Sequence, residues 1–232
     1  MGYWKDKLPS WLFDVLENSR KNWLGKPKLT YSGEGEDLII EKCMKHLKKG
    51  LYVDVGCYHP KVGSNTYRIF KKGWSGINID PNPQTIRLFK QYRPKDINLN
   101  IGISETGETL TYYEFEESAV STFSEEFYKM RIEQGSKYVG SKSIPTKTLA
   151  EVFDQHVKGR HIDVLDVDTE GIDVQVLKSN NWEKYKPSMI LVEDQDETVD
   201  NPAQLETYKL LHPMGYQLIA KTMSTAIYLL KK

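Results

Sequence analysis

The chain has 232 residues, enough for one α/β domain with a sizeable core. Its 32 basic and 32 acidic side chains give a net charge of zero, which argues against a nucleic-acid partner held by bulk charge. The two cysteines, Cys43 and Cys57, lack the spacing of a zinc site and are too few for a disulfide framework. No apolar run approaches the roughly 20 residues of a transmembrane helix, and no signal-peptide block is visible. We therefore expect a cytoplasmic protein without a transmembrane segment.

Residues 1–30 are predicted to form a helical extension ahead of one domain at residues 31–232. Apolar side chains lie at helical spacing along one stripe of this extension: Trp4, Leu8, Trp11, Leu12, Val15 and Leu16. The stripe packs on its own domain, on a second copy in a homodimer, or on a membrane surface, where nearby basic side chains would assist. These alternatives stay open at the level of sequence.

The most informative stretch is residues 51–80, which is typical of a strand, a tight turn, a helix and a second strand. The first strand is predicted at residues 51–55, with Asp54 near its end and Gly56 directly after it. Ser64 is a good N-cap for the helix that follows. The second strand, residues 77–79, ends at Asp80. Ligands of open α/β sheets bind beyond such strand ends, and an acid 24 residues after Gly56 is placed to accept hydrogen bonds from ribose hydroxyls.

The turn after the first strand indicates which nucleoside is bound. A dinucleotide site normally has G-x-G-x-x-G here, whereas this chain has Gly56-Cys57-Tyr58-His59-Pro60. Such a loop suits a cofactor without phosphates, and S-adenosylmethionine (SAM) is the obvious one. Glu36 begins a predicted helix at residues 31–49, where it either complements the helix dipole or faces the cofactor.

After Asp80, the sequence Pro81-Asn82-Pro83 breaks the strand and restarts a helix. Residues 96–104 are predicted to form a third strand, whose end would lie beside the base of the cofactor. Residues 110–115 are predicted as a further strand, residues 124–134 as a helix with a capping box at Ser124, and residues 135–143 as a mobile loop.

Acidic residues cluster at the ends of two later strands. Residues 162–167 are strand-like, yet Asp166 lies within them and Asp168 and Glu170 follow. Burial of an unpaired charge costs free energy, so we expect these acids to have a functional role. The strand at residues 189–192 is followed by Glu193 and Asp194. Two neighbouring strands therefore bring acids to one edge of the sheet. Residues 216–221 and 225–230 are predicted to form a closing hairpin.

The motifs at these places resemble the FkbM family of SAM-dependent methyltransferases. The matching pieces are YSGEGEDLI, YVDVGCYHPKVGSNT, GWSGINIDPNP, IDVLDVDTEGIDVQVL and PSMILVE, which together span residues 31–193. The resemblance implies a class I methyltransferase fold, an α/β Rossmann-like arrangement with a seven-stranded, mostly parallel sheet and a reversed C-terminal hairpin. It also implies methyl transfer to a hydroxyl, often of a sugar or a natural product. The chain departs from the family where Asp166 stands, because Lys or Ser is usual there.

Carried over by position, the resemblance assigns roles to individual residues. Asp54 and Gly56 would line the methionine end of SAM, Asp80 would bind the ribose, and Asp168 and Glu170 would face the acceptor. The remaining cofactor-binding candidates are Glu36, Asn82, Asn100, Gly102, Ile103 and Asp166.

An alcohol is a poor nucleophile, so a base or a metal must help to remove its proton. Asp168 is the first candidate for either role, and His59 is an alternative base. Asp168, Glu193 and Asp194 form a candidate Mg²⁺ or Mn²⁺ site. The expected acceptor is a small carbohydrate, either free, nucleotide-linked or part of a larger precursor. A methyltransferase acting on RNA or protein, and a non-catalytic nucleoside-binding module, are the alternatives.

Overall fold

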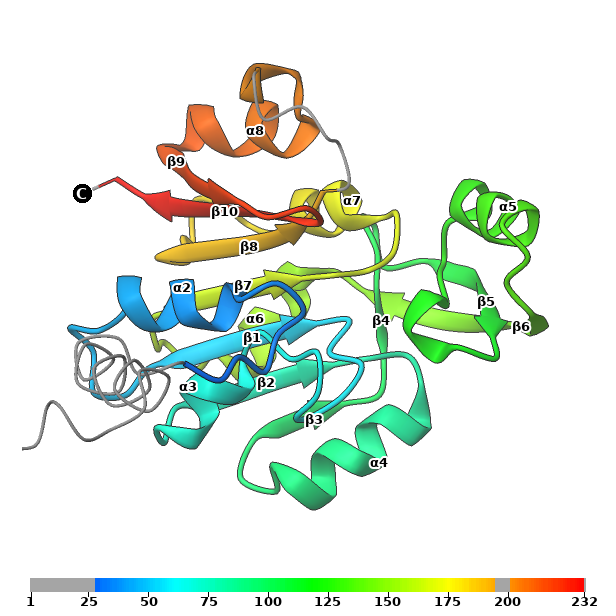
Figure 1. Ribbon diagram of the computed structural model, residues 1–232, viewed down its shortest axis with the longest axis horizontal. Helices are drawn as coiled ribbons and strands as arrows, with labels where there is room; N and C mark the ends of the chain where they lie inside the picture. Colours follow the sequence, from blue (N-terminus) through cyan, green and yellow to red (C-terminus); the bar gives the residue numbers. More distant parts are fainter. Residues whose placement is uncertain (1–27, 195–200, 232) are drawn as a thin grey trace, which may run out of the picture. The chain divides into compact units, whose positions relative to one another are not determined.

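The computed structural model describes residues 28–194 and 201–231, so the predicted N-terminal helix and its apolar stripe lie outside the described residues. The division into an extension and a domain therefore stays a prediction. The described domain is built around a seven-stranded sheet in the order β3-β2-β1-β7-β8-β10-β9 (Figure 1). Its strands are β1 Leu51–Val55, β2 Ser75–Ile79, β3 Ile97–Leu99, β7 Val164–Val167, β8 Met189–Glu193, β9 Tyr216–Lys221 and β10 Thr225–Leu230.

The strand directions confirm the predicted fold class. From β3 to β8 every neighbouring pair is parallel, whereas β10 pairs antiparallel with both β8 and β9. The last two strands are thus the reversed C-terminal hairpin of a Rossmann-like methyltransferase fold. The parallel strands direct their carboxyl ends to one edge of the sheet, where ligands of such sheets bind.

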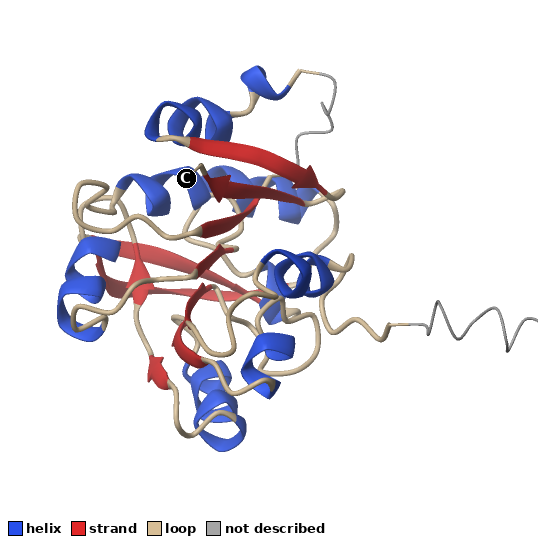
Figure 2. Ribbon diagram, turned by 90° about the vertical axis from the view of Figure 1, so that its left-hand side faces the viewer, coloured by secondary structure: helices blue, strands red, loops and turns tan. Residues whose placement is uncertain are grey.

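Helices cover both faces of this sheet (Figure 2). They are α2 Glu36–Cys43, α3 Tyr67–Lys71, α4 Pro83–Tyr92, α6 Leu149–His156, α7 Asp173–Lys178 and α8 Glu206–Leu211. All five residues of β1 are buried because successive side chains enter two different cores. Val53 packs in the core that contains α6 and α7, whereas Tyr52 packs in the core that contains Ile40 of α2 and Ile69 of α3. Asp54 follows Tyr52 by two residues and shares its face of the sheet.

An excursion between β3 and α6 forms a second, three-stranded sheet in the order β4-β6-β5. It comprises β4 Gly102–Ile103, β5 Thr109–Phe115, the short 3₁₀ helix η2 Ser118–Val120, α5 Glu125–Glu133 and β6 Tyr138–Lys147. Figure 1 shows it beside the carboxyl end of the main sheet. The excursion places its residues next to the predicted site.

Two sequence predictions are wrong in this excursion. The third strand of the main sheet ends at Leu99, and Gly102 and Ile103 pair instead with β6. The predicted mobile loop at residues 135–143 is in large part the first half of β6, which pairs along β5. That strand is rich in small polar residues and lacks an apolar alternation, so its backbone pairing left no trace in the sequence.

The predicted cap at Ser124 is confirmed, because Ser124 accepts a hydrogen bond from the backbone N–H of Phe127. Thr148 likewise caps α6 by accepting from the N–H of Glu151. The complete capping box is at Thr148 and not at Ser124, because Phe127 has no side-chain oxygen to return the bond. Ser64 accepts from the N–H of Tyr67, although Thr66 is the N-cap of α3. None of the helices in the described part of the chain has the length and apolar character needed to cross a membrane.

Candidate cofactor and acceptor site

Two adjoining pockets open at the carboxyl ends of β1, β2 and β7. One comprises about 480 Å³ of space and the other about 460 Å³, open solvent included. Both are lined by Gly56, Tyr58, Ala119, Asp168 and Glu170. Together they have the mixed polar and apolar lining of a small-molecule site. We call the pocket that contains Asp80 the nucleoside pocket and the pocket that contains Asp54 the polar pocket.

Asp80 is the polar centre of the nucleoside pocket. Its Oδ1 accepts a hydrogen bond from the N–H of Asn82 at 2.7 Å, and its Oδ2 accepts one from the N–H of Tyr58 at 3.1 Å. The side chain is buried, and this burial raises the pKa of Asp80 to about 7. The backbone holds the carboxyl group in one orientation, and each oxygen keeps a lone pair for a further donor.

The walls of the nucleoside pocket are apolar and aromatic. Ile101 and Ile103 line it together with Pro81, Tyr112 and Phe123. The rings of Tyr112 and Phe123 pack with their centroids 4.8 Å apart. The flat ring of a nucleobase could therefore pack against apolar side chains here, next to the buried carboxyl group of Asp80.

Three of the predicted cofactor residues shape this pocket without lining it. Asn100 donates from Nδ2 to the backbone carbonyls of Asp80, at 3.0 Å, and Pro81, at 2.9 Å. Asn82 caps α4 by accepting from the N–H of Gln84. A Cβ at Gly102 would lie only 2.6 Å from the ring of Phe123. Direct cofactor contacts by these three residues stay predictions.

The polar pocket contains two buried acids from neighbouring strands, Asp54 of β1 and Asp166 of β7. Asp54 Oδ2 accepts from the hydroxyl of Thr66 at 2.5 Å, and Asp166 Oδ1 accepts from Nδ2 of Asn65 at 3.2 Å. Burial raises the pKa of Asp166 well above its usual range, and the charge of Asp54 raises it further. Burial also raises the pKa of Asp54, against the opposing effect of Arg93. A cationic ligand group would relieve this concentration of negative charge.

Arg93, at the end of α4, supports residues of the polar pocket without lining the pocket itself. This arginine was not identified from the sequence. It is fully buried. Its guanidinium donates to the carbonyl of Pro60 and the hydroxyl of Ser64, and also to the hydroxyl of Thr66 at 2.8 Å. Because Thr66 accepts from Arg93, its own proton is directed to Asp54. No sequence signal separates this arginine from Arg87, which is exposed on the same helix.

Gly56 is required by a contact within the protein. It has φ +77°, and a Cβ there would lie 1.7 Å from the backbone oxygen of Asp168. The residue therefore allows the loop after β1 to touch the loop after β7. Its predicted contact with the cofactor stays a prediction, although it lines both pockets.

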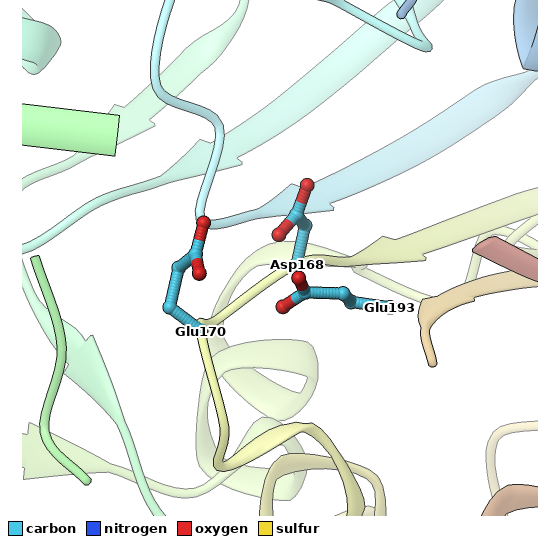
Figure 3. Close-up of side chains that lie close together, drawn as sticks. All are labelled: Asp168, Glu170 and Glu193. Atoms are coloured by element: carbon cyan, nitrogen blue, oxygen red, sulfur yellow. The ribbon is translucent and has the colours of Figure 1, made fainter. Parts of the chain in front are cut away.

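Asp168, Glu170 and Glu193 form a carboxylate trio where the two pockets meet the end of β8. One oxygen of each lies within 4.8 Å of the others, and the three side chains point toward one another (Figure 3). Asp168 is exposed toward the pockets, although many protein atoms surround its carboxyl group. Burial, followed by the charge of Glu193, raises the pKa of Asp168 well above its usual range and that of Glu170 to about 8. These oxygen ligands have the chemistry that Mg²⁺ and Mn²⁺ prefer.

The trio differs from the predicted metal set in one residue. Asp194 lies outside it, because its Oδ2 accepts from the hydroxyl of Thr207 at 2.8 Å and its Oδ1 lies 4.0 Å from Nζ of Lys221. Glu170 occupies the third position, with Arg131 Nη2 3.8 Å from its carboxylate. The turn at Glu170, where φ is +54°, brings this side chain back toward the pockets.

His59 and Glu36 are not brought into either pocket lining. His59 Nδ1 accepts from the N–H groups of Lys61 and Val62, so the atom that would act as a base is engaged in a turn. The carboxylate of Glu36 accepts from the N–H of Glu34 and the hydroxyl of Thr222. Asp168 lines both pockets and His59 lines neither. The roles of Asp168 and His59 as bases and the cofactor role of Glu36 stay predictions.

The sheet order, the reversed hairpin and the acids at the ends of β1, β2 and β7 define a Rossmann-like fold of the methyltransferase type. A family model described as the methyltransferase FkbM domain matches residues 54–218. This match covers well over half of the chain, and the chain belongs to the FkbM methyltransferase family. The protein is thus a methyltransferase. No curated protein matches it.

Proposed function

We propose that the protein is a SAM-dependent O-methyltransferase whose acceptor is a hydroxyl group of a carbohydrate. The observation that carries this proposal is the position of the carboxylate trio, directly beside the nucleoside and polar pockets. Methyltransferases of this family generally use SAM. When bound, SAM supplies a methyl group on a positively charged sulfur.

The residues of the two pockets fit that cofactor. Asp80 has an oxygen lone pair available for ribose hydroxyls, and the walls formed by Ile101, Ile103 and Tyr112 suit an adenine. The paired acids Asp54 and Asp166 suit the amino group of the methionine part. The absence of a phosphate-binding glycine pattern after β1 argues for this cofactor over a dinucleotide.

Asp168 is proposed as the group that receives the proton of the acceptor hydroxyl. Its raised pKa makes it a stronger base than an ordinary aspartate. Glu170 and Glu193 keep that pKa high and are placed to hold the acceptor by hydrogen bonds. Positioning of the acceptor oxygen in line with the methyl group supplies much of the remaining acceleration.

A divalent ion is the second means by which the trio would activate the acceptor. Mg²⁺ or Mn²⁺ held by Asp168, Glu170 and Glu193 would lower the pKa of a bound hydroxyl. The two alternatives differ in one measurement, because chelation with EDTA abolishes turnover only if an ion is needed.

Carbohydrate is proposed as the acceptor class because aromatic rings lie beside the trio. Tyr58 is 43% exposed at the mouth of both pockets, where its ring offers a stacking surface for a sugar. Tyr112 and Phe123 lie deeper in the nucleoside pocket, and Tyr113 packs on Tyr128 instead. An RNA acceptor is disfavoured by the neutral net charge.

The test is a methyl-transfer screen over sugars and sugar derivatives, with and without Mg²⁺ and with EDTA. Asp168→Asn is expected to lower turnover at least a hundredfold while SAM still binds. Asp154→Asn, on the exposed face of α6, is the matched control and should leave turnover unchanged. Undiminished turnover by Asp168→Asn would remove the assigned base. Failure to bind SAM in calorimetry would remove the proposed cofactor, and preferred methylation of RNA or protein would replace the acceptor class.

A further inference from the structure

A third pocket, larger than the other two, lies between α5, α7, α8 and the end of β8. It encloses about 1140 Å³ of space open to solvent. Phe127 and Met130 of α5 contribute apolar surface, and the polar lining includes Glu126, Asp173, Glu193 and Glu206. We call this pocket the acidic groove. Nothing in the cofactor assignment uses it.

The acidic groove meets the proposed reaction centre at Glu193. This residue lines the groove, and its carboxylate lies within 4.8 Å of that of Asp168. Asp168 in turn lines both cofactor pockets. A molecule seated in the groove would therefore place one of its groups at the trio, next to the position proposed for the methyl donor.

All charged side chains that line the groove are acidic. Its lining contains five acidic residues and no lysine, arginine or histidine: the acids are Glu126, Asp173, Glu193, Asp194 and Glu206. The described linings of the nucleoside and polar pockets also contain acids and no cationic side chain.

Some of this charge is compensated within the protein. Asp173 accepts from the N–H groups of Thr169 and Gly171, and Asp194 lies near Lys221. Glu206 pairs with Lys209 at 2.6 Å, but both side chains are more than half exposed, so solvent screens that pair. Glu126 is exposed at the groove. Arg131 borders the groove, since its guanidinium lies over the ring of Phe127 and 3.8 Å from the carboxylate of Glu170. The five lining acids outnumber Arg131 and Lys221, so the groove keeps a negative potential toward a ligand.

We infer that the acceptor is an unphosphorylated amino sugar or similar amine-bearing polyol, which lies in the acidic groove with its hydroxyl at the trio. This inference rests on the proposed function and narrows its acceptor class. An ammonium group would be attracted by the acids of the groove, whereas a phosphate or diphosphate would meet no cation in the described linings. Phe127 and Met130 would contact the C–H face of a sugar ring.

The experiment compares acceptors that differ only in charge: an amino sugar, its N-acetyl derivative, its parent neutral sugar and the corresponding sugar phosphate. Binding to the full-length protein is followed by saturation-transfer NMR, and methylation is followed by release of S-adenosylhomocysteine. The amino sugar is expected to bind at least tenfold more tightly than its N-acetyl derivative at low salt, and the difference should shrink at high salt.

Variants of the groove separate this inference from the proposed function. Glu126→Gln and Glu206→Gln, at the outer groove, should weaken binding of the amino sugar several-fold and leave binding of the neutral sugar unchanged. Asp154→Asn is the control for a lost surface acid. Preference for the sugar phosphate, equal binding of charged and neutral sugars, or no binding of any amino sugar would each overturn the inference. Methylation of a neutral or phosphorylated sugar in that case would leave the proposed function standing.

Discussion

Asp54 and Asp166 lie directly opposite each other on the neighbouring parallel strands β1 and β7. Both carboxyl groups are buried on the same face of the sheet. Two acids placed so close together are costly unless a cation or a proton intervenes. Arg93 compensates Asp54 through Thr66, whereas Asp166 has a neutral partner in Asn65. The pair is therefore prepared for one additional positive group from a ligand.

The stability of the ligand-free protein should fall as pH rises. Asp80 and Asp173 have pKa values of about 7, and Glu170 has one of about 8, all above the values of the unfolded chain. Between about pH 4 and 8 the folded state thus binds more protons than the unfolded state. The free energy of unfolding should then decrease by up to about 1.4 kcal/mol per pH unit for each such group.

Denaturant unfolding at pH 5 and pH 8 measures this slope. We expect SAM to reduce it, because its cationic groups would favour the charged acids. Stability that rises over this range would contradict the assigned pKa directions.

Replacement of Gly56 by alanine should destabilise the fold by about 3 kcal/mol. The added methyl group would overlap the backbone oxygen of Asp168, and alanine is strained at φ +77°. Gly63→Ala is the matched control, since Gly63 has φ +67° with no atom within 4 Å of the added Cβ. It should cost only the backbone strain, about 1 to 2 kcal/mol. Equal losses for both variants in urea unfolding would refute the close contact.

Arg93 is expected to affect cofactor binding from a distance. Lysine cannot donate in the forked geometry that reaches both the Pro60 carbonyl and Thr66, so Arg93→Lys should raise the Kd for SAM about tenfold or more. Arg87→Lys, exposed on the same helix, should leave the Kd unchanged. Thr66→Val removes the relay from Arg93 to Asp54, together with the Thr66 contact to the Ser64 hydroxyl, and should reproduce much of the effect. Calorimetry on folded variants decides this, and an unchanged Kd for Thr66→Val would rule out the relay.

Asp80 should be the most sensitive position for the ribose. Asp80→Asn keeps the size of the side chain but weakens its hydrogen bonds to donors, so the Kd for SAM should increase about 10- to 100-fold. The affinity of the wild-type protein for SAM should also increase as pH rises through about 7, because Asp80 then becomes charged. Thr148→Ala, which removes the cap of α6 outside both pocket linings, is the comparison for a purely structural change. No change in Asp80→Asn would place the ribose elsewhere.

Much of this architecture could be predicted from local sequence. The apolar runs predict strands β1, β2, β7 and β8, and the residue pattern near the C-terminus predicts the hairpin. Once the strands are located, the acids at or just after their ends are evident. Asp54, Asp80 and Asp168 were identified in this way, because a charged residue within or directly after a buried strand is unusual. Parallel pairing then brings them to one edge of the sheet.

The remaining features depend on contacts between distant segments. The pairing of β6 with β5 and β4 has no apolar pattern in the sequence. Glu170 takes the place predicted for Asp194 in the trio, because the chain turns at Glu170 and because Thr207 and Lys221 contact Asp194. Arg93 looks like any helix-end arginine until its partners are known. The acidic groove likewise exists only because α5 of the excursion lies near α7 and α8.

A crystal structure with SAM bound would show where the adenosyl group lies. We expect the ribose hydroxyls on Asp80, the base between the side chains of Ile101 and Ile103 and the ring of Tyr112, and the amino group of the methionine part at Asp54 and Asp166. Density for SAM in another part of the molecule, remote from Asp54 and Asp80, would refute this placement.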